Sequence, residues 1–273
     1  MTRLFASAVT AGYGARDVLH DVGLSVAGGE RVALVGPNGS GKTTLLRVLA
    51  GILRPSSGRV ALDDVSIGDL PSRARARRIA LVPQTFTTPF AFTVREVVTL
   101  GRTPYVGTFG RPAPADRDTV ERAMDLVGCR ALAERPISRL SGGERQRALI
   151  GMALAQEADV LLLDEPTVHL DPHQQREALE VLARPVRDRG ACVVAVLHDL
   201  NLAAATADRI VVLAAGRIVA DGPPAAVITP ERMSSVFGAG LFVGMRAGVP
   251  FVLPEPLGSP PGATRSGWST PSG

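Results

Sequence analysis

One glycine-rich segment constrains the fold of this chain more than any other feature of its sequence. The segment consists of nine consecutive residues: Gly36, Pro37, Asn38, Gly39, Ser40, Gly41, Lys42, Thr43 and Thr44. The apolar run 32–35 before it predicts a strand, and residues 44–50 after it carry apolar side chains at helical spacing. In a unit of strand, glycine loop and helix, backbone N–H groups and the positive end of the helix dipole converge on phosphate oxygens. The segment therefore predicts a phosphate-binding loop in an α/β fold.

Lys42 is the single lysine of the chain, whose other 29 basic residues are arginine. A compact ammonium group fits between phosphate oxygens, where a planar guanidinium group is too large. We therefore expect Lys42 to contact the β- and γ-phosphates of a nucleotide, and the hydroxyl of Thr43 to ligate Mg²⁺.

A second apolar run, residues 160–163, predicts a strand that is buried on both faces and ends in Asp164-Glu165-Pro166. A nucleotide site needs a carboxylate for its metal ion and a group that orients water. We therefore expect Asp164 beside Mg²⁺ and Glu165 beside the attacking water. The alternative is that two acidic residues only cap a strand before a turn.

Between these two motifs, Ser141-Gly142-Gly143-Glu144 precedes an apolar helical stretch over residues 148–155. Ser141 and Glu144 fit a capping box, which is the simpler interpretation. The two glycines also free the start of the helix from side chains, so that a phosphate can approach it. Because the chain already has one phosphate-binding loop, this segment predicts a contact with the nucleotide of another subunit.

Together, these motifs resemble those of the ATP-binding subunit of an ABC transporter, over about residues 3–253. The resemblance implies the α/β fold of a P-loop NTPase. Such a fold has a RecA-like, mostly parallel sheet, an inserted α-helical subdomain and an N-terminal antiparallel β portion. The resemblance also implies ATP and Mg²⁺ as cofactors and ATP hydrolysis as the activity.

The expected organisation is one ABC ATPase domain, 1–253, followed by a tail. The domain has three parts: a core over about 1–90 and 156–222, a helical subdomain over about 91–155, and a C-terminal extension, a helix and a short strand, over 223–253. In the tail, 254–273, 13 of the 20 residues are Pro, Gly or Ser. This composition predicts disorder.

The resemblance assigns further residues whose type alone proves little. Tyr13 would stack on adenine, although a generic surface tyrosine is the alternative. Gln84 would ligate Mg²⁺ or water and sense the membrane partner, and His198, by default a surface histidine, would contact the γ-phosphate. Asp171 would cross the dimer interface, where the nearby His169 replaces the small residue of many relatives. The expected catalytic residues are Glu165, His198 and Gln84, the metal ligands Thr43, Gln84 and Asp164, and the nucleotide contacts Tyr13, the glycine-rich segment, Ser141, Gly142, Gly143 and Asp171.

The partners follow from the same resemblance. Two copies would pack head to tail, with each ATP between the glycine-rich segment of one copy and residues 141–143 of the other. No uncharged apolar run reaches the roughly 20 residues that span a bilayer, so the chain would dock on a separate integral membrane permease. A substrate-binding protein would be an indirect partner. The expected location is the cytoplasmic face of the cell membrane.

The permease would contact Gln84 and the segment that follows it, 86–107. Three apolar side chains of this segment, Phe86, Phe90 and Phe92, should then be exposed in the isolated subunit. A place in the core is the alternative.

The charge of the chain does not indicate a nucleic-acid partner, because 30 basic and 26 acidic side chains leave a net charge of only +4. The densest basic run comprises Arg73, Arg75, Arg77 and Arg78. We expect it on a solvated helix face, with a patch for DNA or anionic lipid as the alternative. Cys129 and Cys192 lie 63 residues apart and form no disulfide framework or zinc motif, which favours a reducing compartment.

Three segments, 97–107, 196–201 and 248–254, resemble the importer subgroup for iron-siderophore, haem and cobalamin. One alternative is an importer ATPase for another metal or cofactor. Another is a soluble, non-transport ABC ATPase that acts on ribosomes or DNA. The single cassette, with no sustained heptad repeat between Lys42 and Ser141, disfavours this last class.

Overall fold

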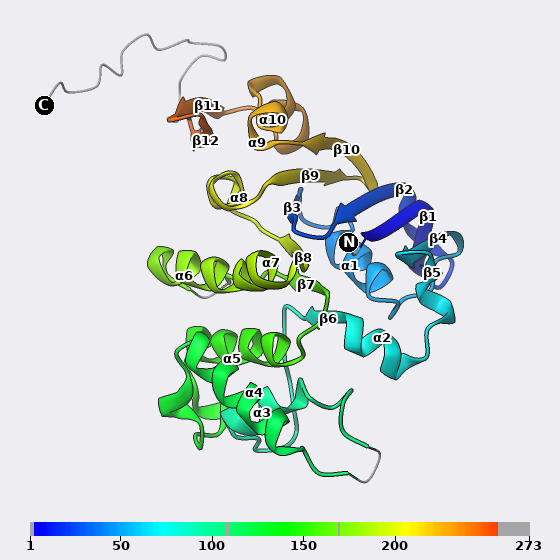
Figure 1. Cartoon of the computed structure of the whole chain (residues 1–273). Helices are drawn as coiled ribbons and strands as arrows, with labels where there is room; N and C mark the ends of the chain where they lie inside the picture. Colours follow the sequence, from blue (N-terminus) through cyan, green and yellow to red (C-terminus); the bar gives the residue numbers. More distant parts are fainter. Residues whose placement is uncertain (1–2, 108–109, 169, 256–273) are drawn as a thin grey trace, which may run out of the picture.

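A six-stranded sheet forms the centre of the molecule, which the computed structural model describes over residues 3–107, 110–168 and 170–255 (Figure 1). Its strand order is β10-β9-β3-β8-β7-β6. The strands are β3 (Arg31–Val35), β6 (Ile79–Val82), β7 (Val160–Asp164), β8 (Cys192–Val196), β9 (Arg209–Ala214) and β10 (Arg217–Gly222). Only β10 runs antiparallel to its neighbour. The predicted mostly parallel sheet is confirmed.

The middle of this sheet is apolar because both of its faces are covered. Every residue of β7 and β8 is buried, as expected for parallel strands between two layers. Parallel strands present their carboxyl ends at one edge of the sheet, which we call the carboxyl edge. The glycine-rich segment after β3, Asp164-Glu165 at the end of β7 and His198 after β8 therefore meet there.

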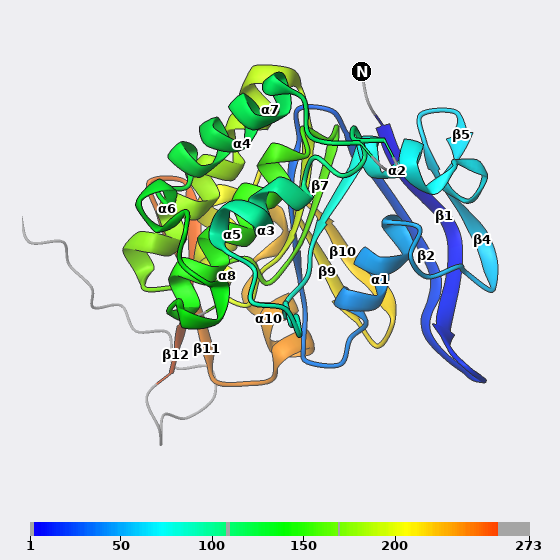
Figure 2. The same ribbon diagram turned by 90° about the horizontal axis from the view of Figure 1, so that it is seen from below.

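A second, antiparallel sheet forms the N-terminal part, as predicted. Its strands, in the order β2-β1-β4-β5, are β1 (Arg3–Tyr13), β2 (Arg16–Ala27), β4 (Ser57–Leu62) and β5 (Val65–Ser66). The helix α1 (Lys42–Leu49) lies between the two sheets (Figure 2). Its Leu45, Leu46 and Leu49 are fully buried and share one core with apolar residues of both sheets. This packing fixes the start of α1 beneath the glycine-rich segment.

The helices form a layer on the other face of the central sheet and a cluster beside β6 (Figures 1 and 2). They are α2 (Ser72–Arg78), α3 (Val94–Leu100), α4 (Pro114–Leu126), α5 (Gly142–Ala155), α6 (Pro172–Leu182), α7 (Arg184–Arg189) and α8 (Leu200–Thr206), with short 3₁₀ turns η1 (Ile67–Asp69), η2 (Arg130–Leu132) and η3 (Ile137–Arg139). In the cluster, Val98, Met124 and Ile150 pack α3, α4 and α5 together. Among the described residues, no helix has the length and apolarity needed to cross a bilayer.

The basic run lies on α2, directly before β6. None of its side chains is buried, as the expected solvated helix face requires, but three of the four guanidinium groups also have partners within the chain. The Nε atoms of Arg73 and Arg77 donate to the carbonyl oxygen of Pro104 at 2.8 and 2.9 Å. Arg78 pairs with the carboxylates of Asp63 and Asp159 at 2.7 and 2.8 Å. These partners lie 15 to 81 residues away in the sequence, so the run itself does not reveal them.

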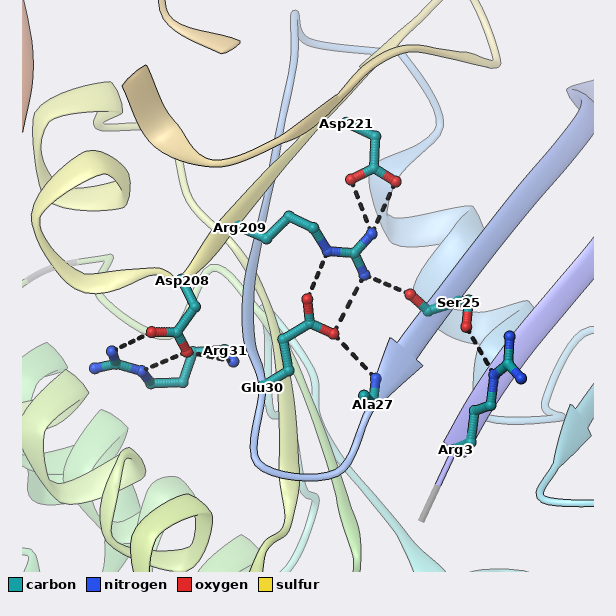
Figure 3. A network of polar contacts seen from close by, with 8 residues as sticks. All are labelled: Arg3, Ser25, Ala27, Glu30, Arg31, Asp208, Arg209 and Asp221. Carbon is teal, nitrogen blue, oxygen red and sulfur yellow. Dashed lines mark hydrogen bonds and ion pairs between the residues drawn. The ribbon is translucent and has the colours of Figure 1, made fainter. Parts of the chain in front are cut away.

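Ion pairs hold the opposite edge of the sheet, at the amino ends of β3 and β9 (Figure 3). The guanidinium group of Arg31 meets the carboxylate of Asp208 with contacts of 2.6 and 3.0 Å. Arg209 donates from Nε to Glu30 at 2.6 Å and from Nη1 to both oxygens of Asp221 at 2.8 and 2.9 Å. We call these five residues the amino-edge network.

The C-terminal extension contains two short helices and a hairpin, more than the single helix and short strand expected. Its elements are α9 (Pro224–Val227), α10 (Pro230–Phe237), β11 (Leu241–Arg246) and β12 (Val249–Pro254). A proline at the first position of each helix starts it separately. Ala247 and Gly248, both with positive φ, form the tight turn of the hairpin. Residues 256–273 lie outside the described residues, so the predicted disorder of the tail remains a prediction.

Candidate active site

The glycine-rich segment connects β3 to α1 at the carboxyl edge. A Cβ atom at Gly36 (φ 152°) would lie 1.9 Å from the carbonyl oxygen of Leu213 in β9, and one at Gly41 (φ 104°) would lie 2.9 Å from a methyl group of Leu19. Only glycine therefore lets the loop pass this close to its neighbours. Gly41 is also the N-cap of α1 and provides no side-chain cap, so backbone N–H groups at the start of this helix remain available to a ligand.

The ammonium group of Lys42 lies within this loop. Its side chain is buried, and Nζ donates to the carbonyl oxygens of Gly36 and Pro37 at 2.8 and 2.9 Å. Burial lowers the pKa of Lys42, and the carboxylates of Glu165 and Asp164 act in the opposite direction. A buried cation whose hydrogen bonds go to the carbonyls of its own loop is suited to an anionic ligand.

Asp164, at the end of β7, supplies a buried oxygen suited to a cation. Its Oδ1 has no hydrogen-bond partner in the part of the chain that the structure describes. Burial raises the pKa of Asp164, while the Thr43 hydroxyl lowers it. A buried carboxylate oxygen without a donor, beside a hydroxyl oxygen, is a hard donor set that fits Mg²⁺. The residues present therefore fit this metal ion.

Glu165 lies at the centre of the site, between two side chains from other loops. Its Oε1 lies 2.5 Å from Nε2 of His198, and its Oε2 accepts from Nε2 of Gln84 at 2.8 Å. Its φ of 54° is unusual for a residue other than glycine and turns the chain sharply after β7. The structure thus brings the three predicted catalytic residues together.

Lys42, Glu165, Gln84 and His198 line one open cavity of about 570 Å³, whereas Asp164 lies outside its lining. It is lined by Val18, Asn38, Gly39, Ser40, Gly41, Lys42, Thr43, Thr44, Gln84, Glu165 and His198. The buried hydroxyl of Ser40 has no partner among the described residues, which suits a donor for phosphate. Residues 38–44 of the glycine-rich segment and the three predicted catalytic residues therefore lie around one cavity at the carboxyl edge.

Tyr13 lies outside the residues that line this cavity, and its predicted contact with adenine remains a prediction. It is half exposed at the end of β1, and its hydroxyl accepts from Nη1 of Arg47 at 3.0 Å. Arg47 also lies close enough to Asp164 to lower its pKa. Sequence reasoning missed Arg47 and the cavity-lining Val18, because neither belongs to a motif and only the packing of α1 and β2 brings them here.

Ser141 and Glu144 form the expected capping box at the start of α5. The Ser141 hydroxyl accepts from the N–H of Glu144 at 3.3 Å, and the Glu144 carboxylate accepts from the N–H of Ser141 at 2.8 Å. Ser141 and Gly142 are exposed, while Gly143 is buried. None of these residues lines the cavity of its own chain, so their contact with a nucleotide would require a second molecule.

Asp171 is the N-cap of α6, and its Oδ1 accepts from the N–H of Gln174 at 2.9 Å. The side chain is exposed, and its predicted place across a dimer interface remains a prediction. His169 lies outside the described residues.

The three phenylalanines of the predicted permease-facing segment differ in exposure. Phe90 is 67% exposed, as expected, whereas Phe86 and Phe92 are partly buried against the core, so the expectation of full exposure is wrong for these two. Beside them is a groove of about 750 Å³ between α2 and α3. Phe92, Leu100, Pro104 and Val106 are among its lining residues. The apolar surface of this segment thus combines one exposed ring with a groove.

Comparison with known proteins identifies clear relatives. The family described as ABC transporter matches residues 19–168. The hemin import ATP-binding protein HmuV of Nocardia farcinica is 49% identical over 82% of this chain and 76% of that protein. The ferric enterobactin transport ATP-binding protein FepC of Escherichia coli is 41% identical over 93% and 94%. The cobalamin import ATP-binding protein BtuD of Halobacterium salinarum is 44% identical over 88% of this chain, which spans only 60% of that protein.

Solved structures share the fold. An inward-facing, putative metal-chelate type ABC transporter aligns with a TM-score of 0.79 at 29% identity, over 93% of this chain and 98% of that one. The ATP-binding cassette MJ0796, a dimer in a post-hydrolysis state bound to ADP and Pi, aligns with a TM-score of 0.73 at 28% identity, over 81% and 98%.

Proposed function

Because this chain belongs to the ABC transporter family, we propose that it is an ATP-hydrolysing subunit of an importer for an iron-siderophore, haem or cobalamin. The observation that carries the hydrolytic part is the position of Glu165. Its carboxylate contacts both His198 and Gln84 in the cavity that also contains the glycine-rich segment. The names of the relatives that cover most of this chain support the cargo classes.

In the proposed mechanism, the backbone N–H groups of residues 38–43 and the ammonium of Lys42 bind the phosphates of ATP. Glu165 orients the attacking water and accepts its proton, while His198 and Gln84 hold the carboxylate in place. Thr43, Asp164 and Gln84 would hold Mg²⁺, which would supply positive charge to neutralise the phosphates of ATP. These groups come from four segments of the carboxyl edge, which lie at or after the ends of β3, β6, β7 and β8, so the folded sheet positions them together.

We propose that a second copy completes the site head to tail. Ser141 and Gly142 are exposed and absent from the cavity of their own chain, which leaves them free to contact a partner's ATP. The dimeric MJ0796 cassette supports this arrangement. ATP bound between the copies would hold them together, and hydrolysis would release them.

The remaining proposed partner is a separate integral membrane permease, which would place this chain at the cytoplasmic face of the cell membrane. The exposed ring of Phe90 and the groove between α2 and α3 support docking there. A substrate-binding protein would act only through the permease.

Substitution of Phe90 tests the coupling to transport. Because the Phe90 ring is mostly exposed, Phe90→Asp should leave folding and ATP hydrolysis by the isolated chain nearly unchanged. It should abolish co-purification with the cognate permease and uptake of labelled iron chelate, haem or cobalamin. Ile52→Asp is the matched control, because Ile52 is another large apolar side chain and is exposed to a similar extent, 64%. Unfolding of the Phe90→Asp chain, or uptake equal to that of the control, would contradict the proposed docking surface.

A further inference from the structure

Two of the segments that resemble the importer subgroup, 196–201 and 248–254, are joined by a pair of hydrogen bonds. The side-chain Nδ2 of Asn201 donates to the carbonyl oxygen of Val252 at 3.0 Å, and the N–H of Val252 donates to Oδ1 of Asn201 at 2.7 Å. One amide side chain therefore pairs with both main-chain groups of a residue in β12, as a neighbouring strand would. The helix α8 packs against β12 at this point.

The backbone N–H group of Asn201 is also hydrogen-bonded, to the side chain of Asp199. Asp199 caps α8, and its Oδ1 accepts from the N–H groups of Asn201 and Leu202 at 2.7 and 3.1 Å. Asp199 directly follows His198, whose Nε2 lies 2.5 Å from Glu165. A short path of hydrogen bonds and adjacent residues thus leads from the C-terminal hairpin through Asn201, Asp199 and His198 to the carboxylate at the centre of the site.

The hairpin itself is well ordered by strand pairing and by packing against the core. The strands β11 and β12 pair along their whole length, and the ring of Phe251 packs over Gly244, where a Cβ atom would lie 2.3 Å from the ring. The side chain of Val252 is buried in the main core. His198 itself is less constrained, because its side chain is 45% exposed. The hydrogen bonds of Asn201 are therefore well placed to restrain the loop that carries His198.

We propose that the hairpin braces the His198 loop, and that Asn201 is the positioning residue through which it acts. This inference rests on the proposed function, in which His198 and Glu165 take part in hydrolysis. Outer-shell hydrogen bonds commonly set the orientation of the groups that contact a reacting centre. A displacement of about 1 Å at such a group can slow a reaction roughly 100-fold, so loss of the brace should be visible in kcat.

A double-mutant cycle on the full chain tests the brace. Asn201→Ala should lower the kcat of ATP hydrolysis roughly tenfold and leave KM for ATP within about twofold, since the glycine-rich segment is untouched. In a His198→Ala background, the same substitution should produce no further loss, because Asn201 acts through His198. A substitution that merely weakened the fold would lower both backgrounds equally. Independent losses in the two backgrounds, or an unchanged kcat of Asn201→Ala, would overturn the inference.

Two further variants keep the test decisive. Ser235→Ala removes one hydrogen bond, from the Ser235 hydroxyl to the carbonyl oxygen of Arg232, in the C-terminal extension that also contains the hairpin. This control variant should leave kcat unchanged. If Asn201→Ala loses folded protein in thermal unfolding, Asn201→Asp replaces it, since it keeps the size of the side chain but sets a carboxylate oxygen against the Val252 carbonyl. A His198→Ala chain that hydrolyses ATP at the normal rate would contradict the proposed function as well. A slow His198→Ala chain with independent losses would contradict the brace alone.

Discussion

The two edges of the central sheet differ in how far the chain satisfies its own charges. At the amino edge, the charged groups of Arg31, Asp208, Arg209, Glu30 and Asp221 all pair with one another (Figure 3). At the carboxyl edge, one oxygen of Asp164 has no partner in the described part of the chain, and the ammonium of Lys42 donates only to carbonyls of its own loop. Paired groups stabilise the fold, whereas groups left without a partner are available to a ligand.

The comparison extends to the helix starts. The helix α1 begins at Gly41 without a side-chain cap and without an acidic residue in its first turn. The helix α5 begins with the complete capping box of Ser141 and Glu144. The start of α1 therefore depends on a ligand for its free N–H groups, while α5 can hold its exposed glycine in place before any partner arrives. Substitutions at both edges of the sheet and at the start of α5 test this division.

Lys42→Ala should have the largest effect, because it removes the ammonium from the carboxyl edge and weakens the binding of ATP, on which hydrolysis and the ATP-bound dimer also depend. We expect ATP affinity to fall at least about 100-fold, the loss of one or more charge-assisted hydrogen bonds to phosphate. Equilibrium titration with a fluorescent ATP analogue measures it. Lys42→Arg should also bind weakly, since the guanidinium group is too large for the loop. Unchanged affinity in Lys42→Ala would show that residues 36–44 are not the phosphate-binding loop.

Glu165→Gln should separate hydrolysis from binding. The amide keeps the size of the side chain but cannot accept a proton, so hydrolysis should fall on the order of 10²- to 10⁴-fold while ATP still binds. The closed dimer should then accumulate. Size-exclusion chromatography should show a dimer of this variant with ATP and a monomer without nucleotide. A monomer under both conditions would contradict the head-to-tail arrangement.

Ser141→Ala tests whether the start of α5 serves a nucleotide or only the helix. Loss of the cap should cost about 1 kcal/mol of stability, and loss of a contact with phosphate should lower hydrolysis roughly tenfold while leaving ATP binding by the monomer intact. Thr93→Ala is the matched control, because Thr93 and Glu96 form an equivalent capping box on α3. It should cost similar stability but leave hydrolysis by the isolated chain unchanged. Equal rates of hydrolysis in the two variants would show that Ser141 only caps α5 and does not contact a nucleotide.

Much of the carboxyl edge could be predicted from local sequence. The glycine-rich segment and Asp164-Glu165 follow apolar runs that predict buried strands, and parallel strands bring such ends together. The contact of Gln84 with Glu165 could not be derived in this way, because it joins residues 81 positions apart and a lone glutamine carries no pattern. Resemblance to a family supplied only the expectation that Gln84 ligates Mg²⁺ or water and senses the membrane partner, and not its contact with Glu165.

Other features depended on packing that the sequence does not encode locally. The three phenylalanines of the permease-facing segment lie within seven residues of one another, yet only Phe90 is mostly exposed. Phe86 and Phe92 pack against the core, which no local pattern of the segment indicates. In the same way, Asn201 pairs with Val252 across 51 positions, and neither residue alone indicates a hydrogen bond. Long-range side-chain contacts of this kind were the part that sequence reasoning missed.

Asp164→Asn should affect stability and activity in opposite directions. Burial raises the pKa of Asp164 in the folded chain, so the ionised carboxylate costs stability, and this cost grows as the pH rises through the raised pKa. The neutral amide should therefore raise the thermal unfolding temperature of the nucleotide-free chain at pH 7. It should also replace the proposed anionic ligand of Mg²⁺ with a neutral one and lower Mg²⁺-dependent hydrolysis. A lower unfolding temperature would mean that Asp164 is already satisfied within the chain.

Asp208→Asn should show the smallest effect, with the opposite sign of pH dependence. The hydrogen bond from Arg31 lowers the pKa of Asp208 in the folded chain. The ionised carboxylate therefore contributes stability that is present above its unfolded pKa of about 3.9 and is lost as the pH falls through the lowered folded pKa. Because the pair is partly exposed, the loss at pH 7 should be only about 0.5 kcal/mol, with unchanged ATP affinity.

Urea unfolding of the wild-type and Asp208→Asn chains at pH 7, 5 and 3 measures this dependence. The difference in the free energy of unfolding should persist from pH 7 to 5 and shrink toward pH 3, where the wild-type carboxylate begins to take up a proton. Added salt should reduce it as well, since solvent ions screen a partly exposed pair. A change in ATP affinity at pH 7 would contradict the division between the two edges, because it would mean that the amino-edge network also shapes the nucleotide site across the length of β3.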